Sequence, residues 1–174
     1  MKVFITDLKK IINRQAFISA HLSDIMPADY QRSQNIKDEN RLLQFLAGRI
    51  LILENFGTDF ETQSNGKIIS NKGYLSLAHS NNFVVLATDD EPVGVDIERI
   101  DNKRNFQKIA LRMKFGKCNT VEDFYKKWTA YEADFKLNPN NKKTSHRFFV
   151  HDGFMICISS LRKKEINIKL QNLL

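Results

Sequence analysis

The chain has 174 residues, 42% of them hydrophobic, which is enough to bury one core of ordinary size. Its 27 Lys and Arg outnumber its 20 Asp and Glu, and the net charge of +7 favours an anionic partner such as a phosphorylated cofactor, an acidic protein or nucleic acid. Two cysteines fit neither a disulfide framework nor a zinc site, and no apolar run approaches the ~20 residues of a membrane span. With no signal-like segment either, we expect a cytoplasmic protein without membrane contact.

The first part of the chain predicts one strand followed by short helices. Residues 1–6 form a short apolar run typical of a strand, and Asp7 can cap a helix that continues to about Phe17. A short helix or turn is expected within residues 21–35, which are polar. These elements carry no chemical motif of their own.

A longer helix is predicted from Asp38 to about Gly57. Its apolar face follows a four-residue step through Leu42, Leu46, Ile50 and Leu53. Gly48 inside this helix costs about 1 kcal/mol relative to Ala, which indicates close contact with another element. Arg41 and Arg49 flank the apolar face, and we assign Arg49 to packing or to a salt bridge.

The middle of the chain predicts a turn and three consecutive strands. Ser64 to Ile69 form a tight turn that feeds a short strand, and residues 75–80 and 83–87 are expected to pair as a hairpin. The third strand, residues 92–99, is expected in the same sheet, so that His79 at the end of the first strand lies near it. A lone histidine is usually structural, but one at an exposed strand end can donate to a phosphate.

Two carboxylates interrupt the third of these strands. Side chains alternate along a strand, so Asp96 and Glu98 point to one face and Val95 and Ile97 to the other. Two like charges at this spacing repel each other unless a cation lies between them, and hard oxygen ligands suit Mg²⁺. The alternative is an edge strand whose polar face is solvated.

The second half of the chain predicts two helices and three strands. One helix covers residues 105–115, and a longer one starts near Thr120 and ends before Pro139. Strands are expected at residues 147–150, 154–158 and 165–170. On the long helix Trp128, Glu132 and Lys136 recur every four residues and share one face. Taken alone, Glu132 and Lys136 could be an ordinary surface salt bridge.

Three motifs together resemble the 4′-phosphopantetheinyl transferases of the surfactin-synthetase type. They are Leu-Ala-His-Ser at 77–80, Gly-Val-Asp-Ile-Glu at 94–98 and Trp-Thr-x-x-Glu-x-x-x-Lys at 128–136. Each motif is weak alone, but their order and separation are specific. The resemblance extends to residues 41–49 and to Asn65-Gly66-Lys67, and it covers roughly residues 38–160.

The resemblance implies a fold and a set of site residues. The fold is α+β and pseudo-twofold, with an N-terminal half (1–90) that contacts the nucleotide of coenzyme A and a C-terminal half (91–174) that holds the metal site. The implied Mg²⁺ ligands are Asp96, Glu98 and Glu132. Coenzyme A binding falls to Arg41, Lys67, His79, Ser80 and Lys136, and catalysis to Glu132, Lys136 and Asp96. A single chain of this kind is expected to be a monomer.

The resemblance also implies a reaction. Coenzyme A donates its phosphopantetheine arm to a serine of an apo acyl or peptidyl carrier protein, with Mg²⁺ as cofactor. Carrier proteins are acidic, which agrees with the net charge of +7. Nucleic acid is then not a partner.

Two alternatives stay open at this point. Tyr131, Ala78 and Ile68 stand where relatives commonly carry Lys, Ser and Pro, which motivates a coenzyme A-binding relative without transfer activity. A Mg²⁺-dependent nuclease would also gather acidic residues in a basic protein. It is less favoured because Glu98 is followed by Arg99 and Ile100 rather than by the Glu-x-Lys that such sheets usually present.

Overall fold

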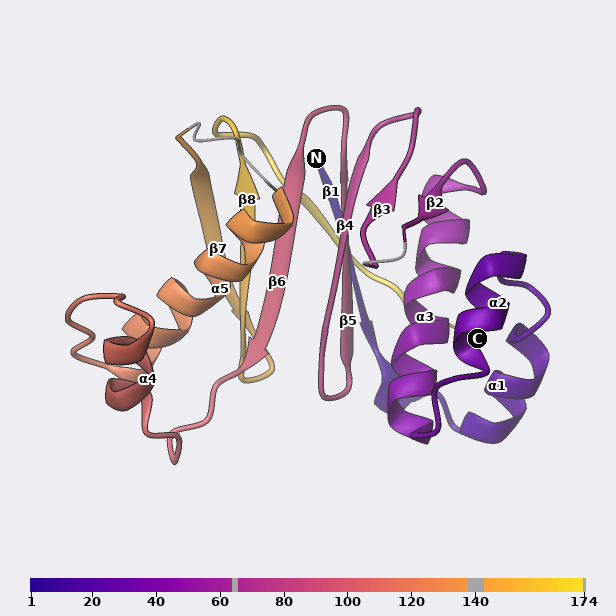
Figure 1. Cartoon of the computed structure of the whole chain (residues 1–174), viewed down its shortest axis with the longest axis horizontal. Helices are drawn as coiled ribbons and strands as arrows, with labels where there is room; N and C mark the ends of the chain where they lie inside the picture. Colours follow the sequence, from indigo (N-terminus) through magenta and orange to yellow (C-terminus); the bar gives the residue numbers. More distant parts are fainter. Residues whose placement is uncertain (64–65, 138–142, 174) are drawn as a thin grey trace.

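A computed structural model describes residues 1–63, 66–137 and 143–173, and its architecture is α+β (Figure 1). The predicted turn residues Ser64 and Asn65 and the predicted helix-breaking run around Pro139 lie outside the described residues. Within the described chain, no helix is both long and apolar enough to span a membrane. The elements, in chain order, are β1 (Lys2–Asp7), η1 (Leu8–Lys10), α1 (Arg14–His21), α2 (Pro27–Ser33), α3 (Glu39–Phe56), β2 (Glu61–Thr62), β3 (Ile68–Ile69), β4 (Tyr74–Ser80), β5 (Phe83–Asp89), β6 (Val93–Arg99), α4 (Phe106–Arg112), α5 (Val121–Leu137), β7 (Ser145–His151), β8 (Phe154–Ser160) and β9 (Asn167–Leu170).

Two sheets form the centre of the molecule. One has the strand order β4-β5-β1-β9 and the other the order β6-β8-β7, while β2 and β3 form a small separate pair. The strand β9 pairs in parallel with β1, so the end of the chain returns to the first sheet. The predicted division into residues 1–90 and 91–174 stays a prediction. The strand β9 belongs to the second half by sequence but pairs with β1 of the first half.

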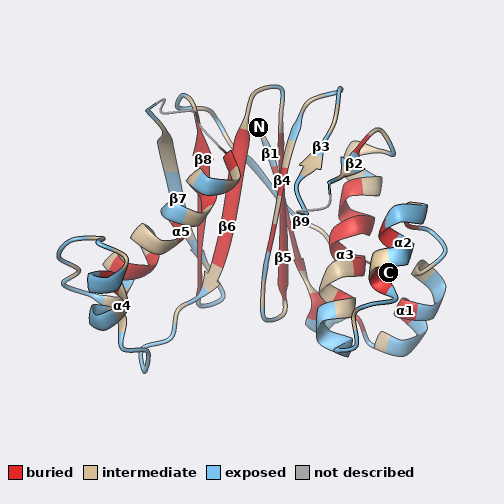
Figure 2. Ribbon diagram, in the orientation of Figure 1, coloured by how far each residue is buried: buried red, intermediate tan, exposed pale blue. Residues whose placement is uncertain are grey.

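The two sheets pack against each other, and helices cover their outer faces (Figures 1 and 2). Alternation along β6 sends Val95 and Ile97 into the core between the sheets, as predicted, and sends Asp96 and Glu98 toward α5. Burial of each Val or Ile contributes about 1.5–3 kcal/mol, so this core fixes the orientation of the two carboxylates. The core between the sheets includes Val3, Ile5, Val85, Ala87, Val93, Val95, Ile97, Ile156 and Ile158.

The helix α3 begins and packs as its sequence predicts. The Asp38 carboxylate accepts a hydrogen bond from the Arg41 backbone N–H at 2.8 Å, which satisfies a donor of the first turn. A Cβ atom at Gly48 would lie 2.7 Å from Leu77 Cδ2 on β4, so the predicted close contact with another element is confirmed. This contact ties α3 to β4, while the helix packs mainly on β5.

The predicted helix capped by Asp7 is wrong. The Asp7 side chain caps only the 3₁₀ turn Leu8–Lys10, after which the backbone is extended at Ile11. A new helix begins where the Asn13 side chain accepts a hydrogen bond from the Ala16 N–H at 3.0 Å. Two capping residues six positions apart therefore divide the apolar run that suggested one helix. The short helix expected within residues 21–35 is present as α2.

The prediction that β6 belongs to the sheet of β4 and β5 is also wrong, because β6 pairs with β8. The two strands still meet at the seam between the sheets. The Ser76 hydroxyl accepts a hydrogen bond from the Val95 N–H at 3.0 Å, and the Ser80 hydroxyl accepts one from the Arg99 N–H at 3.3 Å. Side-chain hydroxyls thus replace a backbone ladder, and the strand carrying His79 lies beside the carboxylate strand as expected.

Candidate active site

Asp96 lies at the centre of the contact between β6 and α5. It is 7% exposed, and its Oδ1 accepts a hydrogen bond from Lys136 Nζ at 2.8 Å. Lys136 Nζ also donates to the Val95 carbonyl at 3.1 Å, so the ammonium is held against β6 by two oxygens. Burial raises the pKa of Asp96 to about 6; Lys136 opposes this shift, and the charges of Glu98 and Glu132 add to it.

Glu98 is held by the same face of α5, about two helical turns before Lys136. Its Oε1 accepts a hydrogen bond from Trp128 Nε1 at 3.2 Å. Burial raises the pKa of Glu98, the hydrogen bond from Trp128 opposes the shift, and the charge of Glu132 adds to it. The predicted face of α5 therefore meets the predicted face of β6, and Lys136 pairs with Asp96 rather than with Glu132 in a surface salt bridge.

The charges of Glu98 and Glu132 help to raise the pKa of Asp96, and the charge of Glu132 helps to raise the pKa of Glu98. Asp96 Oδ2 is buried and has no hydrogen-bond partner. Among residues 1–63, 66–137 and 143–173, however, no three acidic, histidine or cysteine side chains already form a cluster able to hold a metal ion. A buried oxygen without a partner and three mutually repelling carboxylates fit a divalent cation with hard oxygen ligands, and the predicted Mg²⁺ site stays a prediction.

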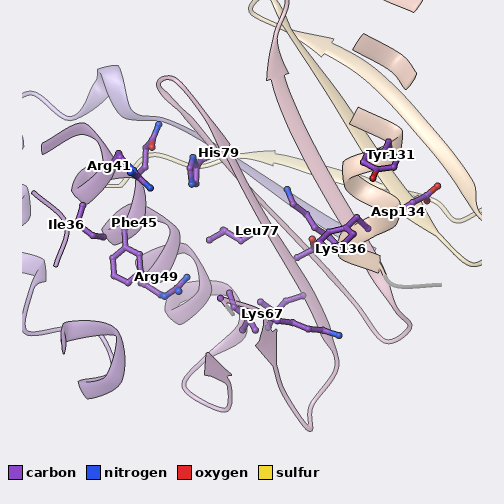
Figure 3. A pocket seen from close by; sticks show the side chains of 16 residues that line it. Ile36, Arg41, Phe45, Arg49, Lys67, Leu77, His79, Tyr131, Asp134 and Lys136 are labelled. Carbon is purple, nitrogen blue, oxygen red and sulfur yellow. The ribbon is translucent and has the colours of Figure 1, made fainter. Parts of the chain in front are cut away.

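A cavity of about 980 Å³ lies beside these carboxylates and spans both halves of the chain. Figure 3 shows Arg41 and Phe45 of α3 on one side, Lys136 of α5 on the other, and Leu77 and His79 of β4 between them. The lining residues are Ile36, Arg41, Gln44, Phe45, Arg49, Gly66, Lys67, Ile68, Leu75, Ser76, Leu77, His79, Tyr131, Asp134, Phe135 and Lys136.

Four cationic or titratable side chains predicted to bind coenzyme A share this cavity: Arg41, Lys67, His79 and Lys136. Burial lowers the pKa of His79, and the charges of Lys136 and Arg41 lower it further. His79 therefore lies in a positive potential, which an anionic ligand would neutralise. Ser80 does not line the cavity; its hydroxyl holds the seam between β4 and β6, and its predicted role stays a prediction.

Arg49 lines the cavity although the sequence predicted only a structural role for it. That role is confirmed: its Nε lies 2.8 Å from Asp29 Oδ2, and its guanidinium lies 4.6 Å from the centre of the Phe45 ring. Burial lowers the pKa of Arg49 despite the opposing effect of Asp29. The basic side of the cavity thus includes a buried guanidinium that already has a carboxylate partner.

Sequence reasoning missed Asp134 and Phe135 as residues of the cavity wall, and it named Tyr131 only as a departure from relatives. All three belong to the helical turns that carry Glu132 and Lys136. Their positions could have been inferred from the periodicity of α5, since residues 131 and 135 are one turn apart. Nothing in the local sequence indicates which element Asp134 contacts.

Comparison with known proteins connects this site to one family. No family model matches the chain. The 4′-phosphopantetheinyl transferase psf-1 of Bacillus pumilus is 32% identical over 93 residues, a match that covers 45% of this chain and 38% of that protein. The 4′-phosphopantetheinyl transferase gsp of Aneurinibacillus migulanus is 29% identical over 136 residues, covering 69% of this chain and 57% of that protein. The chain therefore spans less than two thirds of each relative's length, and these similarities confirm the resemblance to 4′-phosphopantetheinyl transferases that the motifs indicate.

Proposed function

We propose that this protein transfers the phosphopantetheine arm of coenzyme A to a serine of an acidic apo carrier protein, as a pseudo-twofold transferase in the cytoplasm. The observation that carries the proposal is the shared position of Lys136, which lines the large basic cavity and also bonds to Asp96. A single side chain thus connects a surface suited to phosphates with a surface suited to a metal ion. The names of the two relatives support the same activity.

The cavity matches the chemistry of coenzyme A. Arg41, Lys67 and Lys136 supply positive charge for its phosphates, while Phe45 and Leu77 offer apolar surface for the nucleoside and the arm. Charged hydrogen bonds from these cations are worth about 1.5–3 kcal/mol each. Binding of the phosphates would reverse the local potential that lowers the pKa of His79, so His79 gains a proton more readily in the complex.

Asp96, Glu98 and Glu132 would hold the magnesium ion. When bound, this ion supplies charge neutralisation at the pyrophosphate and at the departing phosphate. The serine Oγ attacks the phosphorus that carries the pantetheine arm, the new O–P bond forms, and the bond to the phosphate of 3′,5′-adenosine bisphosphate breaks. Glu132 accepts the proton of the serine hydroxyl, and Lys136 compensates charge on the phosphoryl oxygens.

A basic segment offers a docking surface for the acidic partner. Residues 102–121 contain six Lys and Arg and no Asp or Glu, and all six are exposed. Among these cations lies Leu111 of α4, an apolar side chain that is 81% exposed. The segment lies beside the site. The charge of Arg104 opposes the rise in the pKa of Glu98 that burial causes, and the Phe115 ring centre lies 6.2 Å from that of Trp128. A partner with an acidic helix would therefore present its serine next to the carboxylates.

A second candidate is a coenzyme A-binding protein without transfer activity. Tyr131 favours it, because this half-exposed side chain lines the cavity where relatives commonly carry a lysine. Single-turnover transfer by the parent and by Tyr131→Lys separates the two candidates. Activity that appears only in the variant supports a decayed enzyme.

Intact mass spectrometry of an apo carrier protein incubated with this protein, coenzyme A and Mg²⁺ tests the proposal. We expect the carrier to gain one phosphopantetheine arm, and we expect EDTA to abolish the gain. A carrier in which the acceptor serine is replaced by alanine is the control. If several acidic carriers gain no mass at coenzyme A concentrations that saturate the enzyme, the proposed transfer activity is overturned.

A further inference from the structure

Three residues in register across the second sheet form one row beneath α5. Gly94 of β6 pairs with Ser159 of β8, which pairs in turn with His146 of β7. Partners in adjacent strands direct their side chains to the same face, and this face is the one that carries Asp96 toward α5. At Gly94 the helix approaches so closely that a Cβ atom would lie 2.0 Å from the Ala133 carbonyl oxygen. The α5 backbone therefore rests directly on β6.

Asp134, the next residue of α5, reaches the other two members of this row. Its carboxylate accepts a hydrogen bond from the Ser159 hydroxyl, and His146 Nε2 lies 3.0 Å from each of its oxygens. Thr144 donates a further hydrogen bond at 3.3 Å. Because the ionised carboxylate only accepts hydrogen bonds, His146 carries its proton on Nε2 at this contact. Ser159 is fully buried, whereas the His146 and Asp134 side chains are partly exposed.

The row fixes the last turns of α5 relative to β6. Lys136 follows Asp134 by two residues, and Asp96 follows Gly94 by two residues on the same face of the strand. The contact between Gly94 and Ala133 sets the distance between helix and strand, and the carboxylate of Asp134 opposes rotation or sliding of the helix. Lys136 can then donate to both Val95 and Asp96 while it lines the cavity.

We infer that Asp134, held by Ser159 and His146, is a positioning residue that keeps Lys136 between Asp96 and the anion-binding cavity. The role of Asp134 is indirect, since Figure 3 shows its carboxylate directed away from Lys136. Its effect on ligand binding rests on the proposed function, whereas its effect on Lys136 does not. Asp134 lies within the motif at 128–136, but at a position where that motif specifies no residue type.

Heteronuclear NMR of lysine side-chain ammonium groups tests the effect on Lys136 without any ligand. In the parent protein we expect a protected Lys136 signal, because the ammonium is bonded to two oxygens. The isosteric Asp134→Asn and the small Ser159→Ala changes should each remove this protection. Glu122→Gln is the matched control, since it removes a carboxylate and an ion pair with Lys126 on the same helix, far from the row. An unchanged Lys136 signal in Asp134→Asn overturns the inference.

A double-mutant cycle then measures whether Asp134 acts through Lys136. Coenzyme A affinity is determined by calorimetry for the parent, Asp134→Asn, Lys136→Ala and the double variant. We expect Asp134→Asn to weaken binding about tenfold in the parent but less than about twofold when Lys136 is absent. Equal losses in both backgrounds would assign Asp134 a merely structural role and overturn the inference. If the parent does not bind coenzyme A, the proposed function fails, and the NMR experiment alone decides the inference.

Discussion

At the scale of single residues, Asp96 is a carboxylate whose ionised form destabilises the fold although the proposed chemistry requires it. Its carboxylate is buried against Lys136, one of its oxygens has no hydrogen-bond partner, and its pKa is raised to about 6. A raised pKa means that the folded state holds this proton more tightly than the unfolded state does. The ionised Asp96 therefore destabilises the fold at neutral pH, as expected for a residue retained for its chemistry.

The change Asp96→Asn separates these two effects. In the parent, the contribution of this residue to stability is lost as pH rises from about 4 to about 6, so Asn should raise the melting temperature at pH 7. Near pH 4 the carboxyl is neutral in the folded state and about half ionised in the unfolded state, so most of the gain should disappear. Transfer should be abolished at every pH. Calorimetric scans at pH 4 and pH 7 check this; a variant less stable than the parent at pH 7 and equal to it at pH 4 would contradict it.

Arg41 and Lys67 are the residues at which charge can be removed without disturbing the carboxylates. We expect Arg41→Ala and Lys67→Ala each to raise the KM for coenzyme A about tenfold, with a smaller change in kcat, because each removes a charged hydrogen bond to phosphate. Lys72→Ala is the control, since Lys72 is exposed, pairs with Asp59 and lies outside the cavity. Steady-state kinetics check the prediction. An unchanged KM in both variants would remove these two residues from the binding site.

At the scale of elements, the packing of α5 on β6 depends on Gly94. Alanine there would place a methyl group against the backbone of Ala133 and Leu137, which cannot move aside as a side chain can. We expect Gly94→Ala to destabilise the protein by about 1–3 kcal/mol or more. The matched control is Gly48→Ala, where the crowded atom is the flexible end of Leu77 and alanine favours the helix. Thermal unfolding compares the two; equal losses would show that the approach of α5 to β6 is not limiting.

The sequence predicts elements whose information is local. Trp128, Glu132 and Lys136 share a face because a helix repeats every 3.6 residues, and Asp96 and Glu98 share a face because a strand repeats every two. Those faces meet in the structure as expected. The pairing of β6 with β8, by contrast, joins strands about 60 residues apart, and nothing in residues 75–99 distinguishes it from a three-stranded meander.

The same limit explains the site residues that sequence reasoning missed. Asp134 gains its partners from β7 and β8, whose alternation predicts strands but not the row in which Ser159 and His146 pair. Arg49 lines the cavity because α2 brings Asp29 beneath it. Both depend on contacts between distant parts of the chain, which periodicity does not encode. The residues named by motif were accessible to sequence reasoning because each motif lies within one element.

At the scale of the whole molecule, positively charged side chains gather at two separate places. The basic segment at residues 102–121 lies at the end of α5 that carries Trp128, while the cavity opens between α3 and α5. A carrier protein and coenzyme A would therefore approach from two surfaces and meet at the carboxylates. The positive surface should increase the rate of encounter with an acidic partner in a salt-dependent manner.

Charge reversal on α4 tests this separation of surfaces. The double change Lys108→Glu and Arg112→Glu should raise the KM for an acidic carrier about tenfold or more at low ionic strength, while the KM for coenzyme A stays within about twofold of the parent value. The difference between variant and parent should shrink as salt is added, because exposed charges are screened within about 10 Å at 0.1 M. A change in the KM for coenzyme A instead would place the docking surface elsewhere.

The central claim is that the three carboxylates and the basic cavity form one site. Calorimetric titration with coenzyme A, with and without Mg²⁺, tests this most directly when the parent is compared with Glu132→Gln. We expect Mg²⁺ to strengthen binding of coenzyme A about tenfold or more in the parent and to have little effect in the variant, because the ion requires the third carboxylate. Equal affinity for coenzyme A with and without Mg²⁺ in the parent would contradict the claim.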